Sequence, residues 1–197
     1  MIHPNTELKF INPDIGYGVV ATDFIPKGTI TWTFDKLDRV FTPHDLSHLD
    51  PLYLEILEKY TFRDNKGNHI LCWDNARYVN HSFQPSCITT AYDFELAVRD
   101  IYPGEELTDD YGFLNVTQPF HCLPEDNTSR QVVMPDDLLH YHQEWDDKLL
   151  SAFDFFNKVE QPLQNFLSPD IYQKAVSISR GQSSMDSILF CYYAEQT

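Results

Sequence analysis

The chain has 197 residues, 42% of them apolar and 22% charged, which is enough to bury the hydrophobic core of one domain. Its formal net charge of −16 would repel a phosphate backbone, so we expect no direct nucleic-acid binding and a preference for basic partners. The sequence shows neither an apolar run of membrane-spanning length nor a secretory signal, so we expect an intracellular protein, cytoplasmic or nuclear, without a membrane segment.

The first 114 residues predict a mainly β structure. β-prone runs at 17–21 and 29–34 flank a turn signal at 25–28. Asp50-Pro51 predicts the start of a short helix. The runs 60–62 and 69–73 flank the polar segment 64–68, which predicts a hairpin, and residues 87–98 are again β-prone.

The remaining residues change character. Prolines in 115–134 predict a loop, and apolar residues then recur in steps of three and four, which predicts a helix from Pro135. Ser168-Pro169-Asp170 predicts a second helix that ends at Gly181. We expect this extension, 135–197, to serve mainly for packing; a lid or a homodimer surface is the alternative.

Cysteine usage indicates neither a disulfide framework nor a standard metal motif. Cys72, Cys87, Cys122 and Cys191 are far apart, and none belongs to a C-x-x-C pair. Reduced and mostly buried thiols are therefore expected.

Three short segments carry the polar residues that suggest chemistry. They are Gly16-Tyr17-Gly18, then 77–86 with the letters RYVNHSFQPS, then 103–112 with the letters PGEELTDDYG. Each alone is compatible with an ordinary turn, because glycine, asparagine and proline favour turns anywhere.

Together and in this order, the three segments resemble the SET family of protein-lysine methyltransferases. That family carries G-x-G, then R-F-x-N-H-S-x-x-P-N, then G-E-E-L-T-x-D-Y. The resemblance covers roughly residues 8–114 and implies an α+β, mainly β fold: a SET-domain β-clip at 1–114 with a knot-like C-terminal arrangement, followed by a helical extension.

The resemblance also implies S-adenosylmethionine as cofactor and a set of site residues. Tyr111 falls on the family's catalytic tyrosine. The implied cofactor-binding residues are Gly16, Tyr17, Gly18, Arg77, Asn80 and His81, of which Arg77 has a structural role as its alternative.

The chemistry of methyl transfer suggests further residues. The attacking lysine must be neutral although its free pKa is about 10.4, and a dry aromatic channel lowers that pKa by desolvating the ammonium. Candidate walls are Tyr60, Phe62 and Phe113, each of which could equally be a core aromatic. Asp109 stands where many members carry an aromatic residue that limits the number of methyl groups added.

Other departures concern zinc. Many members bind zinc in a segment after the SET motif, with the frame C-x-C-x-x-x-x-C, and complete the site with a cysteine after Asn-His-Ser. Here only Cys122 remains, while Pro124, Ser129 and Phe83 occupy the other places. One thiolate cannot build a tetrahedral site, so we expect no zinc, and 115–134 resembles a degenerate remnant of the segment.

Two functional hypotheses follow. The first is an active methyltransferase that modifies lysine in a basic protein or peptide, such as a histone tail. The alternative is a catalytically weak or inactive SET-fold module that binds peptide or cofactor. Asp109, the lost zinc segment and Ser86, where the family has asparagine, motivate the alternative, whereas retained Asn80, His81 and Tyr111 argue against it.

Overall fold

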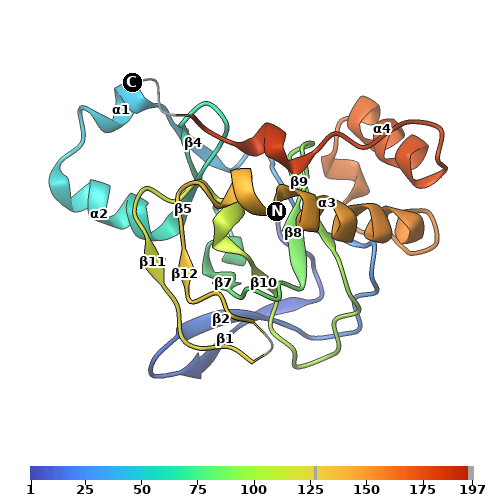
Figure 1. The fold of residues 1–197 in the computed structure, drawn as a ribbon, viewed down its shortest axis with the longest axis horizontal. Coiled ribbons are helices and arrows are strands. Elements are labelled where there is room, and N and C mark those ends of the chain that lie inside the picture. The colour runs from blue at the N-terminus through green and yellow to red at the C-terminus, as the bar shows by residue number, and fades with distance from the viewer. Residues whose placement is uncertain (127, 195–197) are drawn as a thin grey trace.

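The computed structural model describes residues 1–126 and 128–194, and small β-sheets and α-helices share its core (Figure 1). The strands are β1 (Thr6–Asn12), β2 (Gly16–Ala21), β3 (Ile30–Thr33), β4 (Arg39–Phe41), β5 (Thr61–Arg63), β6 (His69–Leu71), β7 (Asn80–His81), β8 (Cys87–Thr89), β9 (Phe94–Ala97), β10 (Thr108–Asp109), β11 (Phe120–His121) and β12 (Val132–Val133). The α-helices are α1 (Pro43–Leu46), α2 (Pro51–Tyr60), α3 (Asp137–Phe156) and α4 (Pro169–Ser179). The expected α+β class is confirmed.

The sheets are small and mostly antiparallel. β1 pairs with β2, and three-stranded sheets have the orders β3-β9-β8 and β4-β6-β5. The hairpin predicted around residues 64–68 is confirmed as β5 and β6, in which Thr61 faces Leu71 and Arg63 faces His69. The helix predicted at Asp50-Pro51 is confirmed as α2, with Pro51 at its first position. β1 and β4 have no counterpart among the predicted elements; β4 has three residues, and most residues of β1 are exposed.

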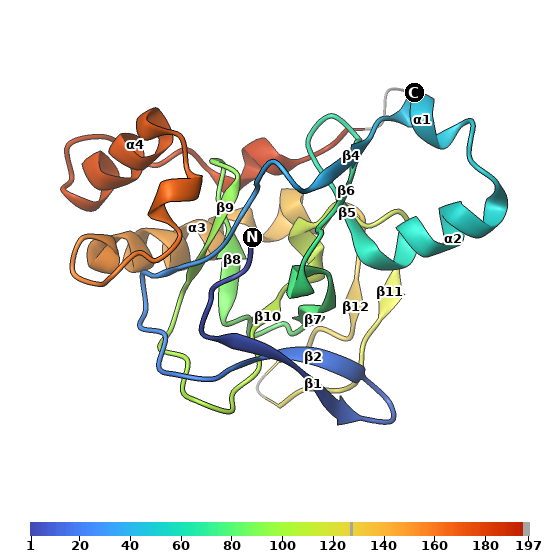
Figure 2. The ribbon, with the colours of Figure 1, turned by 180° about the vertical axis from the view of Figure 1, so that it is seen from behind.

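One parallel pair brings two distant motifs together. β7 lies beside β10, with Asn80 opposite Thr108 and His81 opposite Asp109 (Figure 2). The backbone N–H of Ser82 extends this contact by donating to the Asp109 carbonyl at 2.8 Å. The pairing therefore places the Asn-His segment next to the strand that leads into Tyr111. The knot-like threading expected from the resemblance stays a prediction.

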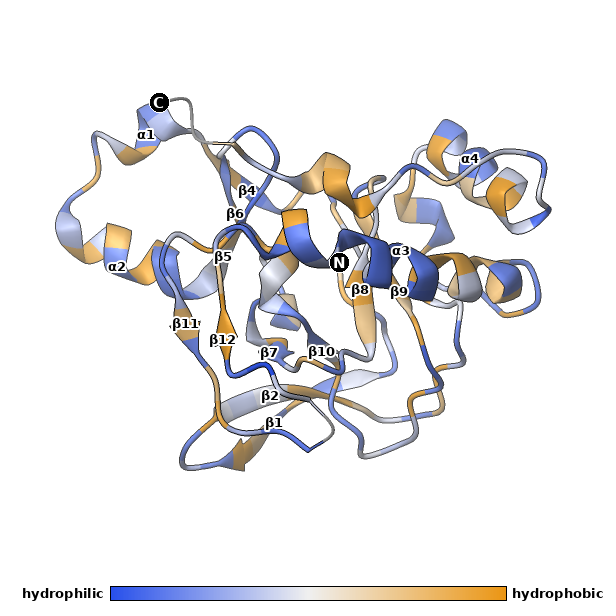
Figure 3. Ribbon diagram, in the orientation of Figure 1, coloured by the Kyte–Doolittle hydropathy of each residue, from blue (hydrophilic) through white to orange (hydrophobic). Residues whose placement is uncertain are grey.

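Of the C-terminal helices, α3 packs against β9 of the β3-β9-β8 sheet, and α4 packs against α3. Hydrophilic and hydrophobic residues alternate along α3 and α4 in Figure 3, and the apolar side chains of α3 that the sequence pattern predicted are buried. Those buried residues are Leu138, Trp145, Leu149, Ala152 and Phe156, whereas His142 of the same pattern is partly exposed and Val159 lies beyond the helix. Of the predicted loop and extension, residue 127 and residues 195–197 lie outside the described residues.

Gln161 ties this extension to the sheet through backbone hydrogen bonds. Its side-chain oxygen accepts from the N–H of Ile30 at 2.9 Å, and its amide donates to the carbonyls of Gly28 at 2.8 Å and Phe156 at 3.0 Å. Gln161 is buried, so these bonds replace water for groups that would otherwise be unpaired. The contact fixes the position of the chain after α3 relative to β3.

Arg130 joins the 115–134 loop to two other segments. Its guanidinium pairs with the carboxylate of Asp110, which precedes Tyr111, and with that of Asp137, the first residue of α3, at 2.6 Å in the latter case. The same group lies over the rings of Phe83 and Tyr141, 4.4 and 4.2 Å from their centroids. Both carboxylates are almost completely buried, so their charges depend on this one cation.

Arg130→Met should lower the free energy of unfolding by about 3–5 kcal/mol, because it leaves two buried carboxylates without their cation. Arg99→Met is the matched control: the Arg99–Glu105 pair is exposed, so its loss should cost about 1 kcal/mol or less. Urea unfolding followed by circular dichroism measures both. Equal losses in the two variants would contradict the structural role of Arg130.

Candidate functional site

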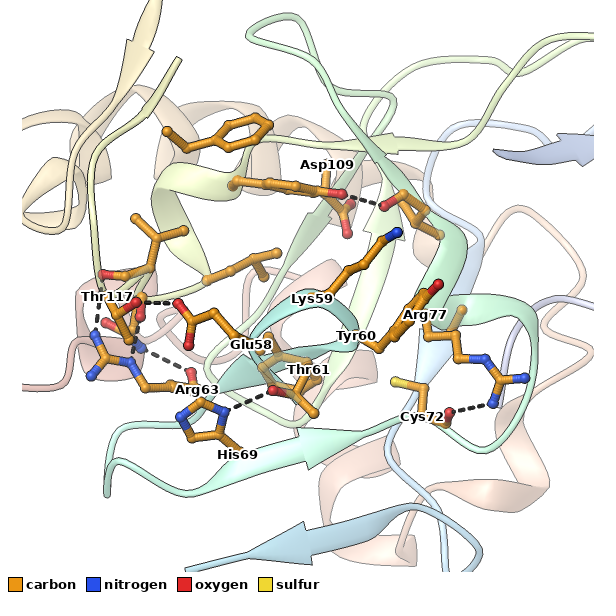
Figure 4. Close-up of a pocket in the computed structure, with 18 of the residues that line it drawn as sticks. Glu58, Lys59, Tyr60, Thr61, Arg63, His69, Cys72, Arg77, Asp109 and Thr117 are labelled. Atoms are coloured by element: carbon orange, nitrogen blue, oxygen red, sulfur yellow. Dashed lines mark hydrogen bonds between the residues drawn. The ribbon is translucent and has the colours of Figure 1, made fainter. Parts of the chain in front are cut away.

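Aromatic side chains from separate segments surround a cavity of about 370 Å³, here called the aromatic cavity (Figure 4). Its lining includes Trp32, Tyr60, Phe62, Cys72, Arg77, Val79, Glu95, Asp109, Tyr111 and Phe120, together with polar residues at the ends of α2 and β5. Trp32 is almost fully buried and meets the Phe62 ring edge to face at 5.7 Å. The aromatic cavity thus has mainly apolar walls, and three acidic side chains, Glu58, Glu95 and Asp109, lie among them.

A second cavity, of about 900 Å³, is here called the histidine cavity. Its lining includes Asp14, Ile15, Asn80, His81, Ser82, Gln84, Arg99, Tyr111, Phe120, Cys122 and Glu125. Tyr111 and Phe120 line both cavities, and their rings are 5.8 Å apart. Tyr111 therefore stands between an aromatic space on one side and a polar space on the other.

Hydrogen bonds hold Tyr111 in place. Its hydroxyl donates to the Val79 carbonyl at 2.9 Å, and its backbone N–H donates to Nδ1 of His81 at 3.1 Å. Burial raises the pKa of the Tyr111 phenol well above its usual range, with a further contribution from the Asp109 charge. Tyr111 consequently remains a neutral phenol at neutral pH, and its hydroxyl oxygen can still accept a hydrogen bond while its proton is donated to Val79.

His81 carries a free donor. Because Nδ1 accepts a hydrogen bond from Tyr111, the proton of the neutral ring resides on Nε2, and this buried atom has no hydrogen-bond partner within the described residues. Burial lowers the pKa of His81 to about 4, and the Arg130 charge contributes in the same direction. A neutral ring with an unpaired N–H is suited to binding an acceptor atom of a ligand in the histidine cavity.

Asn80 links this histidine to the glycine segment. Its amide donates to the Tyr17 carbonyl at 3.0 Å and to the Glu106 carboxylate at 2.5 Å. A Cβ at position 18 would overlap both the Asn80 amide and the Glu106 carboxylate, so this approach requires glycine. Gly16 has φ of +85°, and the Tyr17 side chain is 54% exposed. The structure thus brings Tyr17 and Gly18 beside Asn80, and Gly16 directly precedes them.

Two predicted site residues lie elsewhere. Arg77 does not line the histidine cavity: its guanidinium donates to the carbonyls of Cys72 and Trp73 and it lines the aromatic cavity instead. Phe113 does not line the aromatic cavity. It is 2% exposed, packs edge to face against Trp145 at 5.4 Å and borders a neighbouring cavity of about 770 Å³. Tyr60, Phe62 and Asp109, the other residues expected in a substrate channel, line the aromatic cavity.

Sequence reasoning missed Glu95, Glu106 and Phe120. Glu95 lies in β9 next to Asp109, and only the pairing of β9 with its neighbours reveals that contact. Phe120 reaches Tyr111 from a segment whose sequence indicates only a loop. Glu106 belongs to the same motif as Tyr111, and its position in that motif is the sequence feature that could have identified it as a site residue.

The segment that resembles a zinc-binding frame is held by other contacts. Glu125 accepts hydrogen bonds from the Ser82 hydroxyl at 2.9 Å and from the Phe83 N–H at 3.2 Å. Phe83 is buried, and its ring meets that of His81 at 4.3 Å. Across 1–126 and 128–194, no group of three or more histidine, cysteine, aspartate or glutamate side chains is placed to hold a metal ion. None of the helices in the same residues has the length and apolarity that a membrane crossing needs.

Comparison with known proteins identifies the domain that contains Asn80, His81 and Tyr111. Residues 16–112 match the model of the SET domain. The chain is also similar to Histone-lysine N-methyltransferase trr of Drosophila melanogaster, with 33% identity over 89 residues. This match covers 36% of the chain but 4% of the fly protein, so it concerns one domain of a much longer relative.

The neutral state of His81 predicts a pH dependence of stability. Its pKa is near 6.5 when unfolded and about 4 when folded, so the unfolded chain binds more protons between these values, and stability falls as the pH drops from about 6.5 to 4. His81→Gln should therefore show a smaller loss of unfolding free energy from pH 7 to pH 5 than the wild type. His140→Gln, whose ring is largely exposed, is the control and should keep the wild-type loss. Urea titrations at both pH values test this, and an unchanged loss in His81→Gln would refute it.

Proposed function

Because residues 16–112 of this chain form a SET domain, a domain of the lysine methyltransferase family, we propose that the chain is an S-adenosylmethionine-dependent protein-lysine methyltransferase. The observation that carries the proposal is the position of Tyr111, which lines both the aromatic and the histidine cavity. Methyl transfer requires the two reactants to be aligned at one point, and Tyr111 stands where the two cavities meet.

The residues of the histidine cavity fit the proposed cofactor. S-adenosylmethionine supplies a methyl group on a sulfonium centre, together with polar adenosine and amino-acid groups. The free Nε2–H of His81 offers a donor for an acceptor atom of such a molecule. The Asn80 carboxamide and the glycine segment beside it offer polar backbone and side-chain groups near the same cavity.

The aromatic cavity suits the other reactant, a lysine side chain. Trp32, Tyr60 and Phe62 can surround its methylene groups, and exclusion of water favours the neutral amine over the ammonium. The neutral phenol of Tyr111 can then orient the nitrogen lone pair toward the methyl group. Such a displacement depends on alignment of the reacting atoms, so the contribution of these residues is mainly positional.

The proposed substrate is a basic protein or peptide, with a histone tail as the leading candidate. The net charge of −16 favours encounter with a basic segment and disfavours direct nucleic-acid binding. The name of the fly relative associates its SET-containing protein with histone lysine. The C-terminal helices α3 and α4 serve packing in this proposal, with a homodimer surface as their alternative role.

A binding module without turnover is the second candidate. Asp109, an acid in place of the aromatic residue common in the family, is the observation that favours it. Calorimetry with S-adenosylmethionine and transfer of a radiolabelled methyl group to mixed core histones distinguish the two functions. Cofactor binding without transfer would support the module.

Tyr111→Phe should reduce methyl transfer to histones by on the order of 10²-fold, because it removes the hydroxyl that holds the reacting nitrogen in position. Cofactor binding measured by calorimetry should persist, since the N–H of residue 111 still donates to His81. Tyr102→Phe, at an exposed tyrosine outside both cavities, is the control and should keep wild-type transfer. Undiminished transfer in Tyr111→Phe would overturn the role of the hydroxyl.

A further inference from the structure

Two carboxyl groups meet in the wall of the aromatic cavity. Asp109 belongs to β10, Glu95 belongs to β9, and both line the cavity (Figure 4 labels Asp109). Their side chains lie close enough to share a hydrogen bond, which requires one of the two to carry a proton. Two acids from different strands are thus placed together in a cavity that several aromatic side chains line.

Asp109 is buried, and one of its carboxylate oxygens lacks a hydrogen bond. Its exposed fraction is 5%, and its Oδ1 atom has no hydrogen-bond partner within the described residues. A buried carboxylate oxygen without a donor costs free energy. A ligand that brings an N–H donor into the cavity would satisfy this oxygen, so the unpaired atom itself indicates the chemistry of the ligand.

The environment keeps protons on the pair near neutral pH. Burial raises the pKa of Glu95 to about 7, with the Met1 ammonium and the hydrogen bond to Asp109 opposing the rise. Burial also raises the pKa of Asp109 well above its usual range, and the charges of Glu95 and Asp110 add to this effect. An acid that titrates near neutrality is an effective proton acceptor under physiological conditions.

Other polar groups near the pair cannot replace it. Burial raises the pKa of the Cys87 thiol, which lies close to both acids, and that of the Tyr111 phenol, so both groups stay neutral. The cations in the lining are Lys59, Arg63 and Arg77. Both arginines donate to backbone carbonyls, and Lys59 lies over the Tyr60 ring at 5.2 Å. None of the three, nor Glu58, the further acid of the lining, is among the groups that shift the pKa of Asp109 or Glu95.

We propose that the Asp109–Glu95 pair receives the cationic nitrogen of the substrate lysine in the aromatic cavity and accepts the proton that this nitrogen must lose before methylation. The inference rests on the proposed function and extends it to the origin of the neutral amine. Asp109 and Glu95 would then be catalytic residues, because they touch the reacting nitrogen.

The proton transfer balances within the groups named. The ionised member of the pair takes a proton from the lysine ammonium: an N–H bond breaks, an O–H bond forms, and the pair becomes doubly protonated. The freed nitrogen lone pair forms the bond to the methyl carbon, and the electron pair of the sulfur–methyl bond stays on sulfur. The pair returns its extra proton to water after the product leaves.

Asp109→Asn and Glu95→Gln test the proposal, with Glu55→Gln on the exposed face of α2 as the matched carboxyl-to-amide control. The first readout is binding of n-butylammonium, a lysine-end mimic, and of uncharged 1-butanol, followed by chemical shifts at pH 8. Wild type and control should bind the ammonium about tenfold or more tightly than the alcohol. Both pair variants should lose this preference.

The second readout is the pH profile of methyl transfer to mixed core histones. At pH 7 each pair variant should be about 10²-fold slower than wild type, and the difference should shrink as the pH rises, because solvent then supplies the neutral amine. A merely structural role would lower the rate by the same factor at every pH, and that outcome would overturn the proton transfer.

Thermal unfolding checks that the variants fold. An acid with a raised pKa in the folded state makes stability fall as the pH rises from its unfolded pKa, near 4, through its folded value, which is about 7 for Glu95. The amide variants should therefore melt at or above the wild-type temperature at pH 8. A lower melting temperature there would overturn the idea that a buried acid pair is present.

The two readouts distinguish a failure of the proposed function from a failure of the proposed cation site. If wild-type protein transfers no methyl group, the proposed function fails and the proton-transfer step fails with it. The preference for n-butylammonium then decides whether the pair still receives a cation. Equal binding of ammonium and alcohol by the wild type would overturn the pair as a cation site, even if methyl transfer is observed.

Discussion

The ionic contact of Arg130 with Asp110 and Asp137 connects three parts of the molecule that have little else in common. Asp110 directly precedes Tyr111, Asp137 begins α3, and Arg130 itself lies in the loop between them. Because the two carboxylates are buried, moving this one cation away would leave both negative charges without water or a partner, at a high cost in free energy. The strand leading to the candidate catalytic tyrosine is therefore held to the first turn of the C-terminal extension.

This cluster occupies the region where the family frame would place zinc ligands. Phe83 takes the place of a cysteine, lies beneath the Arg130 guanidinium and contacts the His81 ring. Glu125 fixes the same loop by accepting hydrogen bonds from Ser82 and Phe83. A cation held by carboxylates and aromatic rings thus joins the loop to the SET domain in this chain.

The candidate site follows from how that framework orients two neighbouring segments. β7 and β10 lie side by side, so His81, which lines the histidine cavity, can accept the N–H of Tyr111. Its Nε2 atom is buried without a hydrogen-bond partner among the described residues. The Tyr111 hydroxyl bonds to Val79 on the aromatic side. The same pairing places Asp109 in the lining of the aromatic cavity, beside Glu95 from β9. One short parallel contact therefore positions groups that would serve the cofactor, the substrate nitrogen and its proton.

The sequence by itself determined the family, the α+β class, the hairpin around 64–68, α2, and the buried stripe of α3, because motif order and periodicity are local properties of the chain. It also selected Asn80, His81 and Tyr111, since these residues fall on long motifs. Only the tertiary structure decided that Phe113 packs in the core, that Arg77 lies on the aromatic side, and that Phe120 covers Tyr111. The contact between Glu95 and Asp109 was also decided by the tertiary structure alone. A contact between separate strands depends on register and packing, which no local pattern encodes.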